Sequence, residues 1–340
     1  MRFIKRLLFV LILLTGLSVG AFAAWLYQFA MQPLSLRSSP LDFTVSPGTG
    51  LRFASQQMAE VGIDFPPWQF TLLARLLGKA TEIKAGSYEV EQGVTPWILL
   101  EKLTRGDISQ AEIVFVEGKT FRQMRAILAA HPQVRHDSAN LTDAEILTRI
   151  GATEKHPEGL FSPDTYLFAK NSSDLDLLKR AYRTMQKQLQ AEWEKRDPAV
   201  PYATPYAALI MASIVEKETG IPADRSQVAA VFANRLRLGM LLQTDPTVIY
   251  GLGESYDGNL RKRDLLADTP YNTYTRPGLP PTPIAMPGLA SLQAALHPPN
   301  SDKLYFVARG DGTGSSEFSR SLDEHNRAVA KYIKRRGGDS

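Results

Sequence analysis

The chain contains no cysteine in its 340 residues. This absence excludes disulfide bonds, zinc–thiolate sites and a lipid-modified cysteine near the N-terminus. Histidine is scarce too, because only five are present and none stands in an HExxH motif or another metal-ligand spacing. A glycine-rich phosphate-binding loop is also missing. We therefore predict no metal site and no cofactor.

Apart from its first six residues, the chain has no large excess of positive or negative charge. The formal net charge is +4, from 39 Lys and Arg against 35 Asp and Glu. Arg2, Lys5 and Arg6 hold three of the positive charges. The rest of the chain is nearly neutral and lacks the clustered basic face that nucleic acid binding requires. We therefore expect no nucleic acid partner.

A single long apolar run follows Arg6 and contains no charged residue. About 20 apolar residues cross a bilayer as a helix, so residues 7–30 predict one transmembrane anchor. The positive charges before it predict a cytoplasmic N-terminus, residues 1–6. Trp25 and Tyr27 stand where an interfacial aromatic belt is expected. The sequence thus indicates a single-pass protein of the inner membrane whose main part is periplasmic.

A cleaved signal peptide is the alternative interpretation of the same run. Ala21-Phe22-Ala23 resembles an A-x-A cleavage site. The apolar run continues past this site to Ala30, which favours the anchor. Both interpretations place the remainder of the chain outside the cytoplasm.

The exported part begins with a repeated local pattern of a short strand ending in Val, a glycine turn and an amphipathic helix. It starts at Phe43, at Tyr88 and at Ile113. From residue 43 to about 105 the order strand, helix, helix, strand resembles a LysM module, a fold that binds N-acetylglucosamine-containing glycans. We expect a LysM-like βααβ subdomain at residues 40–108; a purely structural small domain is the alternative.

A larger mixed α/β domain is expected at residues 109–335, before a short tail at 336–340, so the fold class is α+β. Thr204 and Pro205 predict the start of a mainly apolar helix, because Thr caps helices and Pro suits their first position. The other expected elements are helices at 174–196, 224–239 and 322–333, and a buried strand at 304–310. Loops rich in Tyr, Asn, Thr and Pro separate these elements and suit either sugar binding or ordinary turns.

The apolar helix ends in Glu216-Lys217-Glu218, which offers a site for acid chemistry. At 3.6 residues per turn Glu218 lies in line with Ile214 and Met211, and Glu216 points to nearly the opposite side. A carboxyl group at the end of a buried helix is partly desolvated, which raises its pKa and favours a general acid. The alternative is a solvated helix end with an intrahelical ion pair.

A set of ordered motifs resembles the YceG-like endolytic murein transglycosylases, the MltG family. The motifs are ASIVEKET, FANRLRLGMLLQTDPTVIYGLG, TPYNTYTRPGLPP, IAMPG, ALHP and LYFVARGDG. The resemblance is strongest between residues 205 and 325. It implies a lyase that cuts inside growing peptidoglycan strands near the membrane, with Glu218 as catalytic acid. The residues that fall in the cleft-lining motifs are Asn234, Gln243, Thr244, Asp245, Tyr250, Tyr271, Asn272, Thr273 and Tyr274.

One carboxylate is enough for a lytic transglycosylase, which closes a 1,6-anhydro ring and adds no water. A hydrolase needs a second carboxylate, for which Asp245 or Asp164 is available. A third hypothesis is a non-catalytic, membrane-tethered scaffold that binds glycan strands. The expected partners are peptidoglycan strands and, as a further hypothesis, membrane-bound peptidoglycan synthases.

Overall fold

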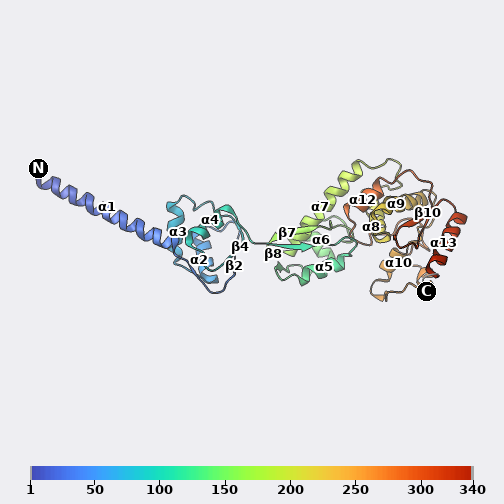
Figure 1. Ribbon diagram of the computed structural model, residues 1–340, viewed down its shortest axis with the longest axis horizontal. Helices are drawn as coiled ribbons and strands as arrows, with labels where there is room; N and C mark the ends of the chain where they lie inside the picture. The colour runs from blue at the N-terminus through green and yellow to red at the C-terminus, as the bar shows by residue number, and fades with distance from the viewer. Residues whose placement is uncertain (1, 338–340) are drawn as a thin grey trace. The chain divides into compact units, whose positions relative to one another are not determined.

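The computed structural model describes residues 2–337 and divides into two compact units (Figure 1). The first unit contains the chain up to Ala111 and the returning segment Leu167–Asn171. The second contains Glu112–Tyr166 and the chain from Ser172 onward. The first unit is therefore made of two stretches that are not contiguous in sequence, and the second stretch includes the end of a strand.

Helix α1 (Arg2–Met31) is long and apolar enough to cross a membrane over Phe3–Met31, with a mean hydropathy of 2.5 in its most apolar window. Most of its side chains are exposed in the isolated chain, as expected for a helix whose neighbours would be lipid. Its last turns join the first unit: Ala30 is buried in that core, and Trp25 stacks on Trp68.

The rest of the first unit packs helices against a two-stranded sheet. Strands β2 and β4 are antiparallel, with Leu41 opposite Val90, and β1 pairs with β3. Tyr88 is fully buried, stacks on Phe43 and donates a hydrogen bond from its hydroxyl to the Lys84 carbonyl. The predicted order of strand, helix, helix and strand is present as β2, α2, α3 and β4, with the short strand β3 added between the two helices. The elements are β1 (Ser35–Leu36), β2 (Leu41–Val45), α2 (Leu51–Val61), β3 (Ile63–Asp64), α3 (Pro67–Leu76), β4 (Gly86–Val90) and α4 (Pro96–Arg105).

The second unit is mainly helical, with small ladders between distant strands. Strands β6 and β8 pair in parallel, and β9 and β10 pair antiparallel. Strands β5 and β7 also pair, and the boundary between the two units falls within both of them. The elements are β5 (Gln110–Val114), α5 (Phe121–Ala130), β6 (Val134–Arg135), α6 (Asp143–Ile150), β7 (Thr165–Ala169), β8 (Ser172–Ser173), α7 (Asp174–Glu194), α8 (Pro205–Glu218), α9 (Pro222–Arg237), α10 (Asp245–Leu252), η1 (Gly253–Ser255), α11 (Lys262–Leu266), α12 (Leu289–Leu296), β9 (Tyr305–Ala308), β10 (Ser316–Ser319) and α13 (Leu322–Gly337).

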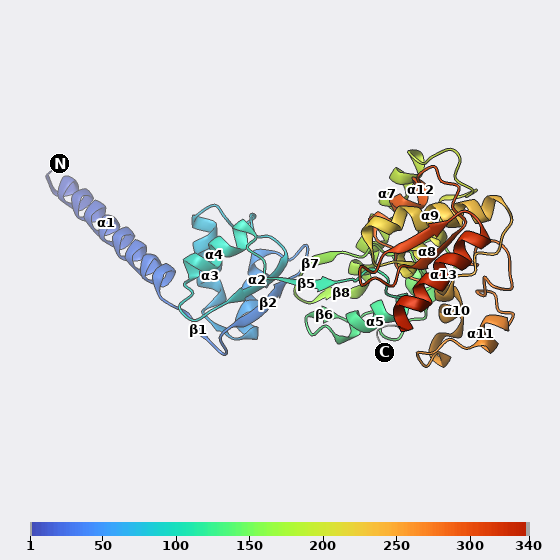
Figure 2. The ribbon, with the colours of Figure 1, turned by 45° about the vertical axis from the view of Figure 1, so that its right-hand side comes forward.

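Helix α8 is the central element of this unit. The Thr204 hydroxyl accepts a hydrogen bond from the Ala207 N–H at 3.1 Å and caps the helix, with Pro205 at its first position, as predicted. The stretch from Ala208 to Val215 is buried without interruption. Helices α7, α9, α10 and α12 pack against it (Figure 2). A helix buried all round holds its last residue, Glu218, in a fixed place.

Two local predictions are wrong. Asp224 does not cap a helix, because α9 begins two residues earlier with Pro222 at its first position, and the Asp224 carboxylate instead accepts the Ser316 N–H at 2.6 Å. The strand β9 is half-buried rather than buried, because it pairs with β10 alone. The predicted tail begins inside α13, and its residues 338–340 lie outside the described part of the chain.

Candidate active site

Glu218 is the last residue of α8 and is half-buried, so its carboxyl group is both shielded and accessible. Its Oε2 accepts a hydrogen bond from the Thr244 hydroxyl at 2.6 Å. Burial raises the pKa of Glu218, the nearby Asp245 raises it further, and the Thr244 hydrogen bond and Arg235 partly oppose the rise. This environment favours a protonated carboxyl group.

The other two residues of the triplet also contact protein. Glu216 accepts hydrogen bonds from the Gly288 N–H at 3.1 Å and the Ser291 hydroxyl at 2.7 Å, so it fastens the start of α12. Lys217 donates to the Gly118 carbonyl at 3.2 Å. The alternative of a solvated helix end with an ion pair is therefore wrong.

The start of α10 and the loop at 271–274 meet at Glu218. The Gln243 N–H donates to the Thr273 carbonyl, and the Thr244 N–H donates to the Thr273 hydroxyl, both at 3.1 Å. The Tyr274 hydroxyl donates to Asp245 at 2.6 Å. Gln243 has a φ of +51°, a conformation that non-glycine residues rarely adopt. These contacts join five of the predicted cleft residues into two adjacent segments, and Thr244 links those segments to the Glu218 carboxyl group.

Two predicted residues hold backbone and do not reach Glu218. Asn272 is fully buried, and its amide nitrogen donates to the carbonyls of Asp264, Leu265 and Ala267. Asn234 donates to the carbonyls of Ser301 and Lys303, ahead of β9. Both asparagines therefore hold loop backbone in place.

Arg235 was not predicted and has a central position. It is buried, and it donates to the Leu304 carbonyl at 2.7 Å and the Leu242 carbonyl at 2.8 Å. Its guanidinium group lies 5.1 Å from the centre of the Tyr305 ring. Burial lowers the pKa of Arg235. It fixes the segment that leads to Thr244 and supplies positive charge near Glu218. Nothing in the local sequence distinguishes it from the other arginines of α9.

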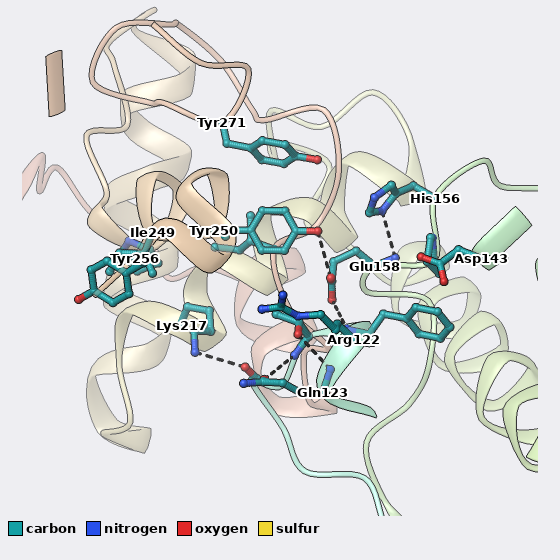
Figure 3. A pocket seen from close by; sticks show the side chains of 17 residues that line it. Arg122, Gln123, Asp143, His156, Glu158, Lys217, Ile249, Tyr250, Tyr256 and Tyr271 are labelled. Carbon is teal, nitrogen blue, oxygen red and sulfur yellow. Dashed lines mark hydrogen bonds between the residues drawn. The ribbon is translucent and has the colours of Figure 1, made fainter. Parts of the chain in front are cut away.

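A pocket of about 760 Å³ adjoins this site (Figure 3). Its lining includes Lys217 and Pro246, the chain neighbours of Glu218 and Asp245. Tyr250 and Tyr271 face it, with ring centres 4.9 Å apart in an edge arrangement. Pockets of this size bury small ligands, and aromatic faces next to polar groups suit sugar rings.

Glu158 lines the same pocket and was also not predicted. It is 3% exposed and accepts hydrogen bonds from the Phe121 N–H and the Tyr250 hydroxyl, each at 3.0 Å (Figure 3). Burial raises its pKa to about 7, against the effect of both hydrogen bonds. Its sequence context, PEGLF, shows no catalytic motif. Only the fold brings it to Tyr250.

Replacing Glu158 with Gln is expected to change how stability depends on pH. A pKa that rises from 4.5 to about 7 on folding stabilises the protein below pH 4.5, and this contribution is lost as pH rises through 7. A glutamine side chain does not titrate, so the variant lacks this loss. From pH 4.5 to pH 8, the free energy of unfolding of the variant should therefore increase by about 2–3 kcal/mol relative to that of the wild type. Urea unfolding at both pH values measures this gain. Parallel pH dependences would show that Glu158 is not perturbed.

No group of three or more His, Cys, Asp and Glu that could hold a metal ion occurs within residues 2–337.

Comparisons with known proteins agree on one family. The model of the YceG-like family matches residues 43–331. A Bacillus subtilis (strain 168) protein named endolytic murein transglycosylase is 36% identical over 272 residues, which cover 75% of this chain and 74% of that protein. A Streptococcus pneumoniae protein of the same name is 25% identical over 361 aligned residues, covering 95% of this chain and 64% of the relative.

A solved structure agrees with them. The crystal structure of a protein from Listeria monocytogenes, described as YceG-like, is 31% identical and superposes with a TM-score of 0.54, covering 85% of this chain and 99% of that one. The family model alone spans more than half of the chain. The chain therefore belongs to the YceG-like family.

Proposed function

We propose that this chain is an endolytic peptidoglycan lytic transglycosylase, a lyase that cleaves the bond between N-acetylmuramic acid and N-acetylglucosamine within nascent strands. The observation that carries the proposal is the half-buried Glu218, with its raised pKa and its hydrogen bond from Thr244. The names of the relatives from Bacillus subtilis and Streptococcus pneumoniae support the substrate class. Cleavage would end strand elongation.

Glu218 would act first as acid and then as base. Protonated Glu218 gives its proton to the glycosidic oxygen, and the bond from muramic acid C1 to that oxygen breaks through an oxocarbenium-like transition state. The Glu218 carboxylate then takes the proton of the muramic C6 hydroxyl, whose oxygen bonds to C1. The 1,6-anhydro ring forms, and no water is consumed. General acid–base catalysis of this kind contributes about 10²–10⁴-fold.

The neighbouring residues would divide between proton control and substrate binding. Asp245 is exposed and raises the pKa of Glu218, which keeps the acid protonated. The residues that we assign to sugar binding or to shaping the sugar site are Asn234, Gln243, Thr244, Asp245, Tyr250, Tyr271, Asn272, Thr273 and Tyr274. For a hydrolase, Asp245 is a stronger second carboxylate than Asp164, because the charge of Asp245 acts on Glu218, whereas the Asp164 side chain accepts a hydrogen bond from the N–H of its chain neighbour Thr165.

The first unit would place the enzyme at the membrane. α1 would cross the inner membrane, with a cytoplasmic N-terminus and both units in the periplasm. The βααβ order with antiparallel β2 and β4 supports a LysM-like, glycan-binding role for residues 40–108. Residues 109–335 would form the catalytic domain, and membrane peptidoglycan synthases would be partners of an enzyme that acts on their product.

The pH dependence of activity should respond to the two neighbours of Glu218 in opposite directions. Asp245 raises the pKa of Glu218. In Asp245→Asn, the fall of kcat/KM on the alkaline side of its pH profile should therefore move to lower pH. The Thr244 hydrogen bond lowers that pKa, so in Thr244→Val the same fall should move to higher pH. Rate profiles of both variants measure the shifts. Movement of this fall in the same direction in both variants would contradict the assignment of Glu218 as the acid.

The products test the proposal directly. The full chain in detergent would be incubated with un-crosslinked glycan strands, and the fragments would be weighed by mass spectrometry. Internal fragments that end in 1,6-anhydro-muramic acid are expected. Fragments heavier by one water would indicate a hydrolase with a second carboxylate, and substitution of Asp245 and of Asp164 would then identify it. Strands that bind but remain whole would indicate a scaffold.

A further inference from the structure

A second pocket, of about 520 Å³, lies between α2 and α3 in the first unit. Two of its lining residues are arginines, Arg52 and Arg75, and none is acidic. The others are neutral, and one of them is an exposed tryptophan. The lining residues are Arg52, Gln56, Pro67, Trp68, Thr71, Leu72 and Arg75. The pocket therefore offers positive charge without a counter-charge of its own.

Within the described residues 2–337, neither arginine takes part in an ion pair, and both are exposed. Some other basic residues of the same unit have acidic partners: Lys102 pairs with Asp107, and Lys170 pairs with Asp42. A guanidinium group binds phosphate through two parallel hydrogen bonds. Two of them at one pocket fit an anionic phosphate better than an uncharged sugar.

The depth of this pocket relative to a bilayer follows from α1. The apolar run begins at Leu7, and about 20 residues at about 1.5 Å each cover about 30 Å, the thickness of the hydrocarbon core. Trp25 then lies at the far boundary, where tryptophan is enriched. Trp25 stacks on Trp68, with ring centres 5.7 Å apart and planes inclined by 20°. Trp68 is 60% exposed and lines the pocket, so one wall of the pocket lies at headgroup depth.

We propose that Arg52, Arg75 and Trp68 form a binding site for the phosphate of an anionic phospholipid at the bilayer surface. The inference rests on the proposal that α1 spans the membrane. The arginines would bind the phosphodiester, and the Trp25–Trp68 pair would lie among the glycerol and upper acyl groups. Such a site holds the first unit against the bilayer by a contact separate from α1 itself.

Lipid retention by the full chain tests the site. Wild-type protein in detergent would be mixed with equal amounts of phosphatidylglycerol and phosphatidylcholine, and native mass spectrometry would count the bound lipids. Wild type should retain phosphatidylglycerol in preference. The double variant Arg52→Ala/Arg75→Ala should lose at least about tenfold of this preference, since each basic residue near the surface contributes separately.

A charge-matched control is available in the same unit. Lys79→Ala/Arg105→Ala removes two positive charges outside the pocket: Arg105 pairs with Glu101, and Lys79 lies over the Trp97 ring. This control should keep the wild-type preference. Thermal melting by circular dichroism checks folding, and Arg52→Gln/Arg75→Gln replaces the alanine pair if the latter melts early.

Three outcomes would overturn the site. In the first, the variant Arg52→Ala/Arg75→Ala keeps the wild-type lipid preference. In the second, this variant and the Lys79→Ala/Arg105→Ala control lose the preference equally, which would mean general charge attraction. In the third, the variant Arg52→Ala/Arg75→Ala still binds lipid but no longer co-sediments with glycan strands, which would make the pocket a saccharide site. Wild-type protein that stays soluble without detergent would contradict the membrane span of α1, a failure distinct from these three.

Discussion

Replacing Glu218 with Gln is expected to reduce the rate of 1,6-anhydro end formation by about 10²–10⁴-fold, the usual contribution of a general acid and base. Gln keeps the size of the side chain, and its amide oxygen still accepts the Thr244 hydroxyl. It cannot release a proton to the glycosidic oxygen, nor take one from the C6 hydroxyl. Binding of glycan strands should be retained, so kcat should fall much more than KM changes.

Glu216→Gln is the matched control for this variant. It makes the same chemical change two residues away on α8, at a carboxylate that binds the Gly288 N–H and the Ser291 hydroxyl. Its expected effect is a loss of stability through weaker attachment of α12, with most of the activity retained below its melting temperature. Equal loss of activity in both variants would mean that the helix end as a whole, and not Glu218, is required.

Arg235→Met is expected to lower the free energy of unfolding of the second unit by about 3 kcal/mol. Methionine fills much of the space of the arginine stem, but the buried Leu242 carbonyl and the partly buried Leu304 carbonyl lose their donors. Leaving a buried carbonyl without a partner costs about 1–3 kcal/mol. Denaturant unfolding followed by tryptophan fluorescence measures the loss.

Arg237→Met provides the comparison, because it removes an arginine two residues further along the same helix. Arg237 is exposed and donates to the Ala199 carbonyl and to Asn234 near solvent. Water replaces such partners, so its loss should cost less than about 1 kcal/mol. If the two variants were equally stable, the carbonyls of Leu242 and Leu304 would not depend on Arg235 as their donor.

Local sequence rules predicted the elements whose signals are local. Thr204 and Pro205 predict the start of α8, and the unbroken apolar stretch after them predicts that the helix is buried. The length and lack of charge of the first run predict α1 in the same way. The capping role predicted for Asp224 was wrong, because an aspartate near a helix start can either cap the helix or bind another segment. Here it binds Ser316, which is so distant in sequence that no local rule indicates the contact.

The candidate site was predictable only in part, because its contacts join distant segments. The sequence indicated Glu218 through the helix that holds it, and the family resemblance indicated the loops at 243–245 and 271–274. Glu158 and Arg235 were missed for a common reason: each is one charged residue in an unremarkable segment. What distinguishes them is burial against Tyr250 or against the Leu242 carbonyl, and only the folded chain contains those pairs.

The most direct test of the central claim is cleavage of glycan strands by wild-type protein in ¹⁸O-labelled water. If the C6 hydroxyl closes on C1 with Glu218 as the one acid and base, the new muramic acid ends should contain no label and weigh one water less than a reducing end. Incorporation of one ¹⁸O into those ends would contradict ring closure. It would show instead that water attacks C1, and that a second carboxylate participates.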